Sequence, residues 1–284
     1  MQERRNTRMA TENTLITGDR NAVITLVRRC AHRHLLRGGT QAADRKTDGS
    51  WVTATDHAMQ SDLQAGLAER FPAHGFLGEE MDLAAQEAAW RECLDGRPTW
   101  VVDPLDGTSN FRVGFPVFSV TVALLVGGQT VFGVVFDPSR DECFHAARGD
   151  GAWLNGERLS LVNEPRQALK SCLATVDFKR LPRDVATHLA CDPPYASQRS
   201  IGSVALDWCW VAAHRVQVYV HGKQKLWDYA AGQLILHEAG GASADLDGEL
   251  DYLDRPLEPL PRSAVAATHV ELLEDWLGEL RAES

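Results

Sequence analysis

The sequence predicts an α+β lobe followed by an α/β lobe, and two patterns carry this prediction. Apolar stretches at residues 118–124 and 131–136 flank Gly127-Gly128, as in a hairpin of an antiparallel sheet. After Pro165 short strands alternate with helical segments instead, which is typical of an α/β lobe. We therefore expect three parts, namely a flexible tail at residues 1–15, an α+β lobe at 16–165 and an α/β lobe at 166–284.

Helical spacing of apolar residues predicts two helices near the start of the first lobe. The first runs from about residue 17 to 37 and is ended by Gly38-Gly39. The second has Thr55 or Asp56 as its expected N-cap. The apolar positions that we expect to face the core in these two helices are Val23, Val27, Cys30, Ala31, Leu35, Met59, Leu63 and Leu67.

Strands and further helices are expected along the rest of the chain. Apolar or β-branched segments predict strands at residues 51–53, 75–78, 100–102, 142–146, 152–154, 172–176, 216–220 and 264–267. Helical patterns cover residues 83–94, 185–189, 203–213 and 227–239. A last helix is expected to turn four apolar side chains inward, those of Val270, Leu273, Leu277 and Leu280.

Composition narrows the class of protein. With 284 residues, 44% hydrophobic and 24% charged, the chain has the composition of a soluble globular protein and can bury a large core. A net charge of −10 disfavours a nucleic-acid partner, and no apolar stretch is long enough to span a membrane. The six cysteines show no C-x-x-C spacing, which favours reduced thiols and a cytoplasmic location.

One acidic turn stands out. The apolar segment Trp100–Val102 predicts a buried strand that stops at Asp103, because Pro104 cannot continue it regularly. Asp106-Gly107 predicts a turn, and two carboxylates this close repel each other unless a cation lies between them. Oxygen ligands without thiolates favour magnesium or calcium, and backbone N–H groups at Gly107 and Thr108 could hold an anion. The alternative is that both aspartates only cap a turn.

Three other acidic positions can also be interpreted either as part of a cation site or as ordinary surface or capping residues. Glu79-Glu80 follow an expected strand and are either surface charges or partners of a cation. Asp56 is explained by capping alone. Asp228 lies in the first turn of an apolar helix, where a carboxylate interacts well with the helix dipole, or it faces a cleft between the lobes.

Taken together, these motifs resemble the inositol monophosphatase family, a magnesium-dependent, lithium-sensitive phosphatase group related to fructose-1,6-bisphosphatase. The resemblance implies a layered αβαβα fold and magnesium-dependent hydrolysis of a small phosphorylated metabolite, with two to three metal ions. It also implies a homodimer without nucleic-acid or membrane partners. The segments that carry it are Val52-Thr53-Ala54-Thr55-Asp56, Gly78-Glu79-Glu80, Asp103-Pro104-Leu105-Asp106-Gly107-Thr108, Gly149-Asp150-Gly151-Ala152, Asn155-Gly156, Trp227-Asp228 with Ala230-Ala231-Gly232, and Glu238-Ala239-Gly240-Gly241.

The resemblance also implies a role for each residue of the site. One magnesium would be held by Glu79, Asp103 and the carbonyl of Leu105, and a second by Asp103, Asp106 and Asp228. A weaker third ion would contact Glu79. The pair formed by Thr108 and Asp56 would help to activate the attacking water, and the N–H groups of Gly107 and Thr108 would bind phosphate oxygens.

The substrate is less well defined by the sequence. Inositol-preferring members of the family usually have a glutamate at the position of His221, where it meets ring hydroxyls, and an imidazole near a lysine could instead favour a second anionic group. Discrimination between alcohols is expected from Ser203, His221 and the loop Gly222–Lys225, together with Asp228. The alternative is that His221 is simply exposed. We expect inositol 1-phosphate or a related sugar or polyol phosphate. The alternatives are 3′-phosphoadenosine 5′-phosphate, fructose 1,6-bisphosphate, histidinol phosphate, or a non-catalytic protein that binds phosphorylated metabolites.

Overall fold

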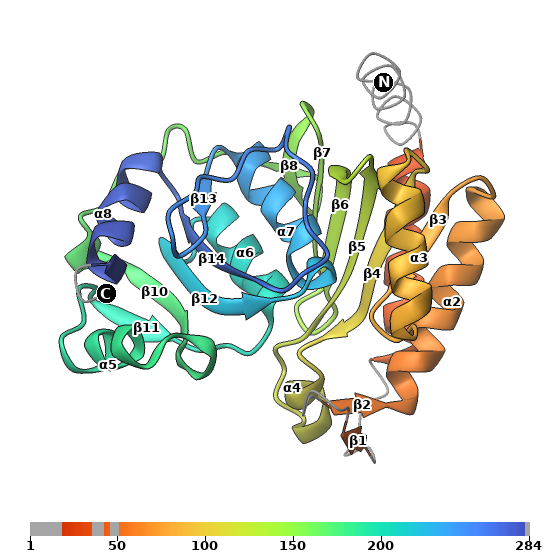
Figure 1. Cartoon of the computed structure of the whole chain (residues 1–284), viewed down its shortest axis with the longest axis horizontal. Coiled ribbons are helices and arrows are strands. Elements are labelled where there is room, and N and C mark those ends of the chain that lie inside the picture. Colours follow the sequence, from red (N-terminus) through yellow and green to blue (C-terminus); the bar gives the residue numbers. More distant parts are fainter. Residues whose placement is uncertain (1–18, 36–42, 46–50, 282–284) are drawn as a thin grey trace.

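Two β-sheets alternate with three layers of helices (Figure 1). The computed structural model describes residues 19–35, 43–45 and 51–281, so the expected tail and the Gly38-Gly39 helix end lie outside the described residues. Within the described chain, one sheet has seven strands and another has five. A small third sheet pairs β1 (Ala43–Arg45) with β2 (Trp51–Thr53).

The seven-stranded sheet follows the order of the chain. Its pairs are antiparallel, except that the edge strand β3 runs parallel to β4. Gly127-Gly128 connects β5 and β6, which confirms the predicted hairpin. The strands are β3 (Gly75–Gly78), β4 (Thr99–Asp106), β5 (Ser119–Val126), β6 (Gln129–Asp137), β7 (Glu142–Ala147), β8 (Gly151–Leu154) and β9 (Glu157–Leu159).

Two helices cover the outer face of this sheet, one over residues 19–34 and α2 (Ala54–Arg70). All the core positions expected in these helices are buried. The expected N-cap at Thr55 or Asp56 is wrong. The cap is Thr53, whose backbone is extended, and Asp56 reaches back to accept a hydrogen bond from its N–H at 2.7 Å. This reciprocal arrangement is a capping box.

The five-stranded sheet is mixed and has the order β11-β10-β12-β14-β13. Its strands are β10 (Leu173–Asp177), β11 (Ser197–Arg199), β12 (Val218–Gln224), β13 (Ala242–Ala244) and β14 (Arg262–Ala267). The helices α5 (Arg183–Cys191) and α8 (Val270–Arg281) cover its outer face. Leu273, Leu277 and Leu280 of α8 are buried as expected, but Val270 begins the helix and is exposed.

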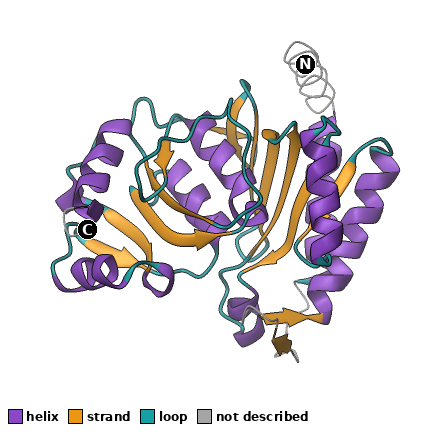
Figure 2. Ribbon diagram, in the orientation of Figure 1, coloured by secondary structure: helices purple, strands orange, loops and turns teal. Residues whose placement is uncertain are grey.

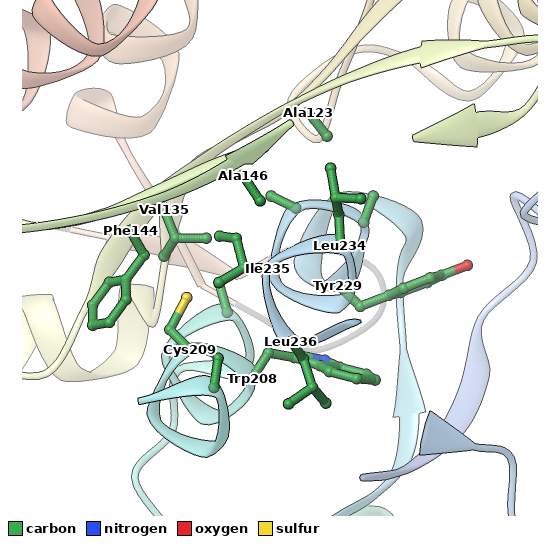
Figure 3. Close-up of a cluster of buried hydrophobic side chains, with 14 of the residues drawn as sticks. Ala123, Val135, Phe144, Ala146, Trp208, Cys209, Tyr229, Leu234, Ile235 and Leu236 are labelled. Atoms are coloured by element: carbon green, nitrogen blue, oxygen red, sulfur yellow. The ribbon is translucent and has the colours of Figure 1, made fainter. Parts of the chain in front are cut away.

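The helices α6 (Val204–Ala212) and α7 (Leu226–Ala239) lie between the two sheets (Figure 2). Figure 3 shows Ile235 and Leu234 of α7 pointing toward the small and branched side chains of the seven-stranded sheet, beside Trp208 and Cys209 of α6. On the opposite side this core includes Tyr219 of β12. The resulting order of layers, αβαβα, confirms the expected fold. The lobe boundary at residue 165 stays a prediction.

Several elements differ from the expectations. The helix α3 (Leu83–Leu94) has the predicted bounds, but the short strands β9, β11 and β13 and the six-residue helix α4 (Thr108–Val113) were not predicted. The strand β4 also does not stop at Asp103. It continues to Asp106 with a shift in register between these two residues, because Pro104 interrupts the regular pairing without ending the strand.

Candidate active site

A pocket of about 600 Å³ opens where β4 ends, next to the first turns of α6 and α7. It brings together residues that lie far apart in the sequence. The expected site residues that line it are Glu79, Asp103, Leu105, Asp106, Gly107, Thr108, Ser203, His221 and Asp228. Asp56 lies behind this lining and reaches it through a hydrogen bond from Thr108.

The interruption of β4 fixes the position of Asp103. Asp103 Oδ1 accepts a hydrogen bond from the N–H of Leu105 at 2.9 Å, which closes a tight turn around Pro104. The Asp103 side chain is buried, yet it lines the pocket. The irregular end of the strand therefore directs a carboxylate into the pocket.

Asp106 connects the seven-stranded sheet to the middle layer. Its Oδ2 accepts hydrogen bonds from the Ser203 hydroxyl at 2.5 Å and from the Ala205 N–H at 2.9 Å, and its Oδ1 accepts one from the Val204 N–H at 3.2 Å. It thus satisfies donors in the first turn of α6 that the helix itself leaves unpaired. The Ser203 hydroxyl is thus used by Asp106 in this structure. Its expected role as a substrate contact stays a prediction.

Asp228 and Glu79 complete the acidic side of the pocket. Asp228 lies in the first turn of α7, where its Oδ2 accepts the N–H of Lys225 at 2.8 Å. Glu79 follows β3 directly, and Gln86 Nε2 holds this segment by donating to the carbonyls of Gly78 and Glu79. The Nζ atom of Lys225 lies 3.7 Å from Glu79 Oε1.

These carboxylates disturb one another. Burial, and then the charges of Glu79, Asp106 and Asp228, raise the pKa of Asp103 well above its usual range. Burial, followed by the charges of Glu79 and Asp106, does the same to the pKa of Asp228. Burial also raises the pKa of Asp106, although the hydroxyl and N–H groups at the start of α6 oppose this. We call Glu79, Asp103, Asp106 and Asp228 the acidic wall.

The donor set of the acidic wall suits a hard divalent cation. Its carboxylate oxygens, with the carbonyl of Leu105 beside them, are the ligands that magnesium prefers. A divalent cation would also relieve the repulsion that raises the aspartate pKa values. In the described part of the chain no three acidic, histidine or cysteine side chains are already arranged to hold one ion, so the carboxylates would have to close around it.

Thr108 and Gly107 form the corner of the pocket next to the acidic wall. The Thr108 hydroxyl lies 3.2 Å from Asp56 Oδ1 and 3.0 Å from the carbonyl oxygen of Leu105, and it can donate to either. Gly107 has a left-handed φ of 89°, and a Cβ atom there would also lie 3.1 Å from the carbonyl oxygen of Val117. Only glycine makes this turn without strain, and the backbone of Gly107 lines the pocket.

A second group of residues in the pocket lining carries charges of both signs. It consists of Asp177, Lys179, Arg180, His221 and Lys223, and we call these five residues the mixed wall. His221 is only 1% exposed, so the alternative of an exposed histidine is wrong. Its Nε2 lies 3.0 Å from Asp177 Oδ2, and its Nδ1 accepts the N–H of Lys223 at 3.1 Å.

Two acidic residues of the pocket, Asp177 and Asp207, were not among those expected from the sequence. Asp177 follows the predicted strand at residues 172–176, as Asp103 follows its own strand, and this position was the available signal. Asp207 lies one turn into α6, and burial raises its pKa well above the usual range. Its Oδ1 has no hydrogen-bond partner among the described residues. No sequence motif singled it out.

Two other features bear on the sequence-based expectations. Five of the cysteines are buried, Cys191 is exposed, and all six are free thiols. Among the described residues, no helix combines the length and the apolar character needed to cross a membrane.

Comparison with known proteins places this site in context. The chain matches the inositol monophosphatase family over residues 15–283. It is 39% identical over 213 residues to the Nus factor SuhB of Haemophilus influenzae, covering 74% of this chain and 77% of that one. It is 37% identical over 237 residues to inositol monophosphatase 1 of Solanum lycopersicum, covering 81% and 82%. The crystal structure of extragenic suppressor protein suhB from Bartonella henselae superposes with a TM-score of 0.78 at 27% identity, covering 93% and 98%.

Proposed function

The chain belongs to the inositol monophosphatase family, whose members are phosphatases that hydrolyse phosphate monoesters, and we propose that its substrate is inositol 1-phosphate or a related sugar or polyol phosphate. The observation that carries this proposal is the acidic wall. It places three buried aspartates and Glu79 in one pocket, next to a corner where backbone N–H groups and a hydroxyl can receive a phosphate.

Members of this family are generally metal-dependent, and we propose magnesium, with two to three ions. Glu79, Asp103 and the Leu105 carbonyl would hold one ion. Asp103, Asp106 and Asp228 would hold a second, while a weaker third ion would contact Glu79. When bound, magnesium would supply Lewis acidity toward the phosphate and make an attacking water more acidic. The negative charges of the acidic wall would balance the positive charges of these ions, and the Asp103 and Asp106 side chains that carry them are largely buried.

Thr108 and Gly107, which form the corner of the pocket, would accept a proton from the attacking water and bind the phosphate. The Thr108 hydroxyl would accept a hydrogen bond from the attacking water while it donates to Asp56, whose carboxylate is held by the capping box of α2. This arrangement orients the water and lets its proton leave toward Thr108 and Asp56. The N–H groups of Gly107 and Thr108 would bind phosphate oxygens, and Asp228 would lie against the ester.

A second candidate is a substrate with a further anionic group, such as fructose 1,6-bisphosphate or 3′-phosphoadenosine 5′-phosphate. The side chains of Lys179 and Lys223 favour it, because both line the pocket and carry positive charge. Histidinol phosphate and a non-catalytic binding role stay the remaining alternatives. The homodimer and the cytoplasmic location also stay predictions.

The test is release of inorganic phosphate from these four esters with magnesium, with excess chelator, and with the Asp103→Asn variant. We expect the wild-type protein to hydrolyse at least one ester with magnesium, and inositol 1-phosphate most efficiently. Turnover should be lost with chelator and in the variant, because Asp103 is assigned to two ions. Full turnover by Asp103→Asn in excess chelator would rule out the proposed mechanism.

A further inference from the structure

The mixed wall contains a pair of side chains that neighbouring strands hold face to face. Asp177 is the last residue of β10, and His221 lies within the adjacent parallel strand β12, directly opposite it in register. Asp177 Oδ2 and His221 Nε2 are 3.0 Å apart. Both residues line the pocket, so the pair belongs to the surface that the alcohol part of a substrate would meet.

One ring nitrogen of His221 is bonded to the backbone. Its Nδ1 accepts a hydrogen bond from the backbone N–H of Lys223, so in the neutral ring the proton is on Nε2. The Nε2 atom is buried and lies 3.0 Å from Asp177 Oδ2, but it makes no aligned hydrogen bond among the described residues. The imidazole therefore lies against the Asp177 carboxylate, and the expected direct contact between His221 and the alcohol stays a prediction.

Asp177 keeps an acceptor position free. Its Oδ2 faces Arg180 and His221, while its Oδ1 accepts only the N–H of Lys179 at 3.0 Å. A carboxylate offers about four lone-pair positions, so one on Oδ1 stays available. Burial favours the neutral acid, but the His221 ring and the Arg180 guanidinium outweigh it and lower the pKa of Asp177 to about 2. The side chain is 19% exposed, so a ligand can reach it.

The backbone around the pair is closely fitted. Gly222 follows His221, and a Cβ atom at this position would lie 1.8 Å from the carbonyl oxygen of Arg180. Any other residue would push β12 away from the segment Phe178–Arg180 that follows Asp177. The close approach keeps the histidine and the carboxylate in register, which is the precise support that a binding group needs.

We propose that Asp177 determines specificity by accepting a hydrogen bond from a hydroxyl group of the alcohol that leaves, and that His221 is its positioning residue. This assignment rests on the proposed phosphatase function and names the side chain that selects the substrate class. An anionic group would be repelled by the Asp177 carboxylate itself, and a cationic group by Arg180 and the lysines beside it. A neutral hydroxyl donor fits both charges, as a polyol or sugar phosphate provides.

The test compares two esters in the Asp177→Asn variant. Inositol 1-phosphate carries hydroxyl donors, whereas 4-nitrophenyl phosphate carries none. We expect the ratio of kcat/KM for inositol 1-phosphate over 4-nitrophenyl phosphate to fall by about 10–200-fold, the range of one pocket contact. The matched control is Asp275→Asn, which also removes a carboxylate paired with an arginine, Arg166, but on the surface away from the pocket. It should leave the ratio unchanged.

The role of His221 is tested by rescue. His221→Ala should lower the same ratio, and His221→Gln should restore part of it, because a glutamine amide can still donate to Asp177. An equal loss for both esters in Asp177→Asn would mean a structural role and would overturn the assignment. An unchanged ratio would overturn it too. If the wild-type protein hydrolyses neither ester, the proposed function itself fails and the assignment fails with it.

Discussion

The two walls of the pocket shift the pKa of their aspartates in opposite directions. In the mixed wall Asp177 is paired with Arg180 and His221, and its pKa falls to about 2. In the acidic wall Asp103 is surrounded by other carboxylates, and burial and their charges raise its pKa well above its usual range. Lys225 contributes one positive charge beside Glu79. The carboxylate of the mixed wall is thus paired with a cation from the same wall, whereas the four carboxylates of the acidic wall need further positive charge from outside the chain.

This difference suggests that the two walls would contact different parts of the substrate. In the proposed function the acidic wall and the Thr108 corner would contact the phosphate, which every substrate has in common. The mixed wall would contact the alcohol, which differs between substrates. Substitutions in the first group should therefore reduce turnover of all esters alike, while those in the mixed wall should change the ratio between esters.

Among substitutions that leave the proposed metal ligands intact, the largest kinetic effect is expected for Thr108→Ala. Loss of the hydroxyl that links Asp56 to the attacking water should lower kcat by about 10²–10⁴-fold, the usual contribution of a positioned proton-transfer group. KM should change much less, and the loss should be similar for inositol 1-phosphate and 4-nitrophenyl phosphate. Steady-state kinetics measure both constants.

The control for this substitution is Ser109→Ala, which removes the neighbouring, exposed hydroxyl. It should change kcat far less than Thr108→Ala does. A Thr108→Ala variant that lost only affinity would assign Thr108 to phosphate binding alone and would contradict its role in activating the attacking water.

A smaller effect separates two aspartates within the acidic wall. Asp106→Ala removes the acceptor for Ser203, Val204 and Ala205 at the start of α6, and loss of such a cap costs about 0.5–2 kcal/mol. Asp103→Ala removes mainly repulsion. In excess chelator, Asp106→Ala should therefore melt several degrees below Asp103→Ala. Calorimetry of the two proteins measures this difference, and equal melting temperatures would show that Asp106 does not support α6.

The sequence was informative wherever the signal was local. The helix Leu83–Leu94 and the hairpin turn at Gly127-Gly128 could be predicted, because turn glycines and apolar spacing lie within a few residues of what they determine. The carboxylates of the acidic wall could be singled out for the same reason. Asp103 and Asp106 are close in sequence, and Glu79 directly follows a strand.

Long-range register was not available in the same way. Asp177 and His221 meet only because β10 and β12 pair in parallel, and nothing near either residue indicates that register. Likewise, Asp106 caps α6 across a long separation, which no local pattern could reveal. The cap expected at Thr55 or Asp56 lies too late, because Asp56 is the acidic partner in a capping box whose cap is Thr53.

The most direct test of the account is the melting temperature of the wild-type protein and of Asp103→Asn, each in excess chelator and in millimolar magnesium. The wild-type protein should gain several degrees with magnesium, since a ligand at 100 times its Kd adds about 2.7 kcal/mol and each kcal/mol shifts the Tm by about 2–4 °C. In chelator, Asp103→Asn should melt higher than the wild type, because asparagine keeps the contact with the Leu105 N–H and removes a buried repelling charge, and its gain with magnesium should be small. An unchanged wild-type melting temperature in magnesium, or a chelated Asp103→Asn that is less stable than the wild type, would contradict the claim that the acidic wall needs a cation.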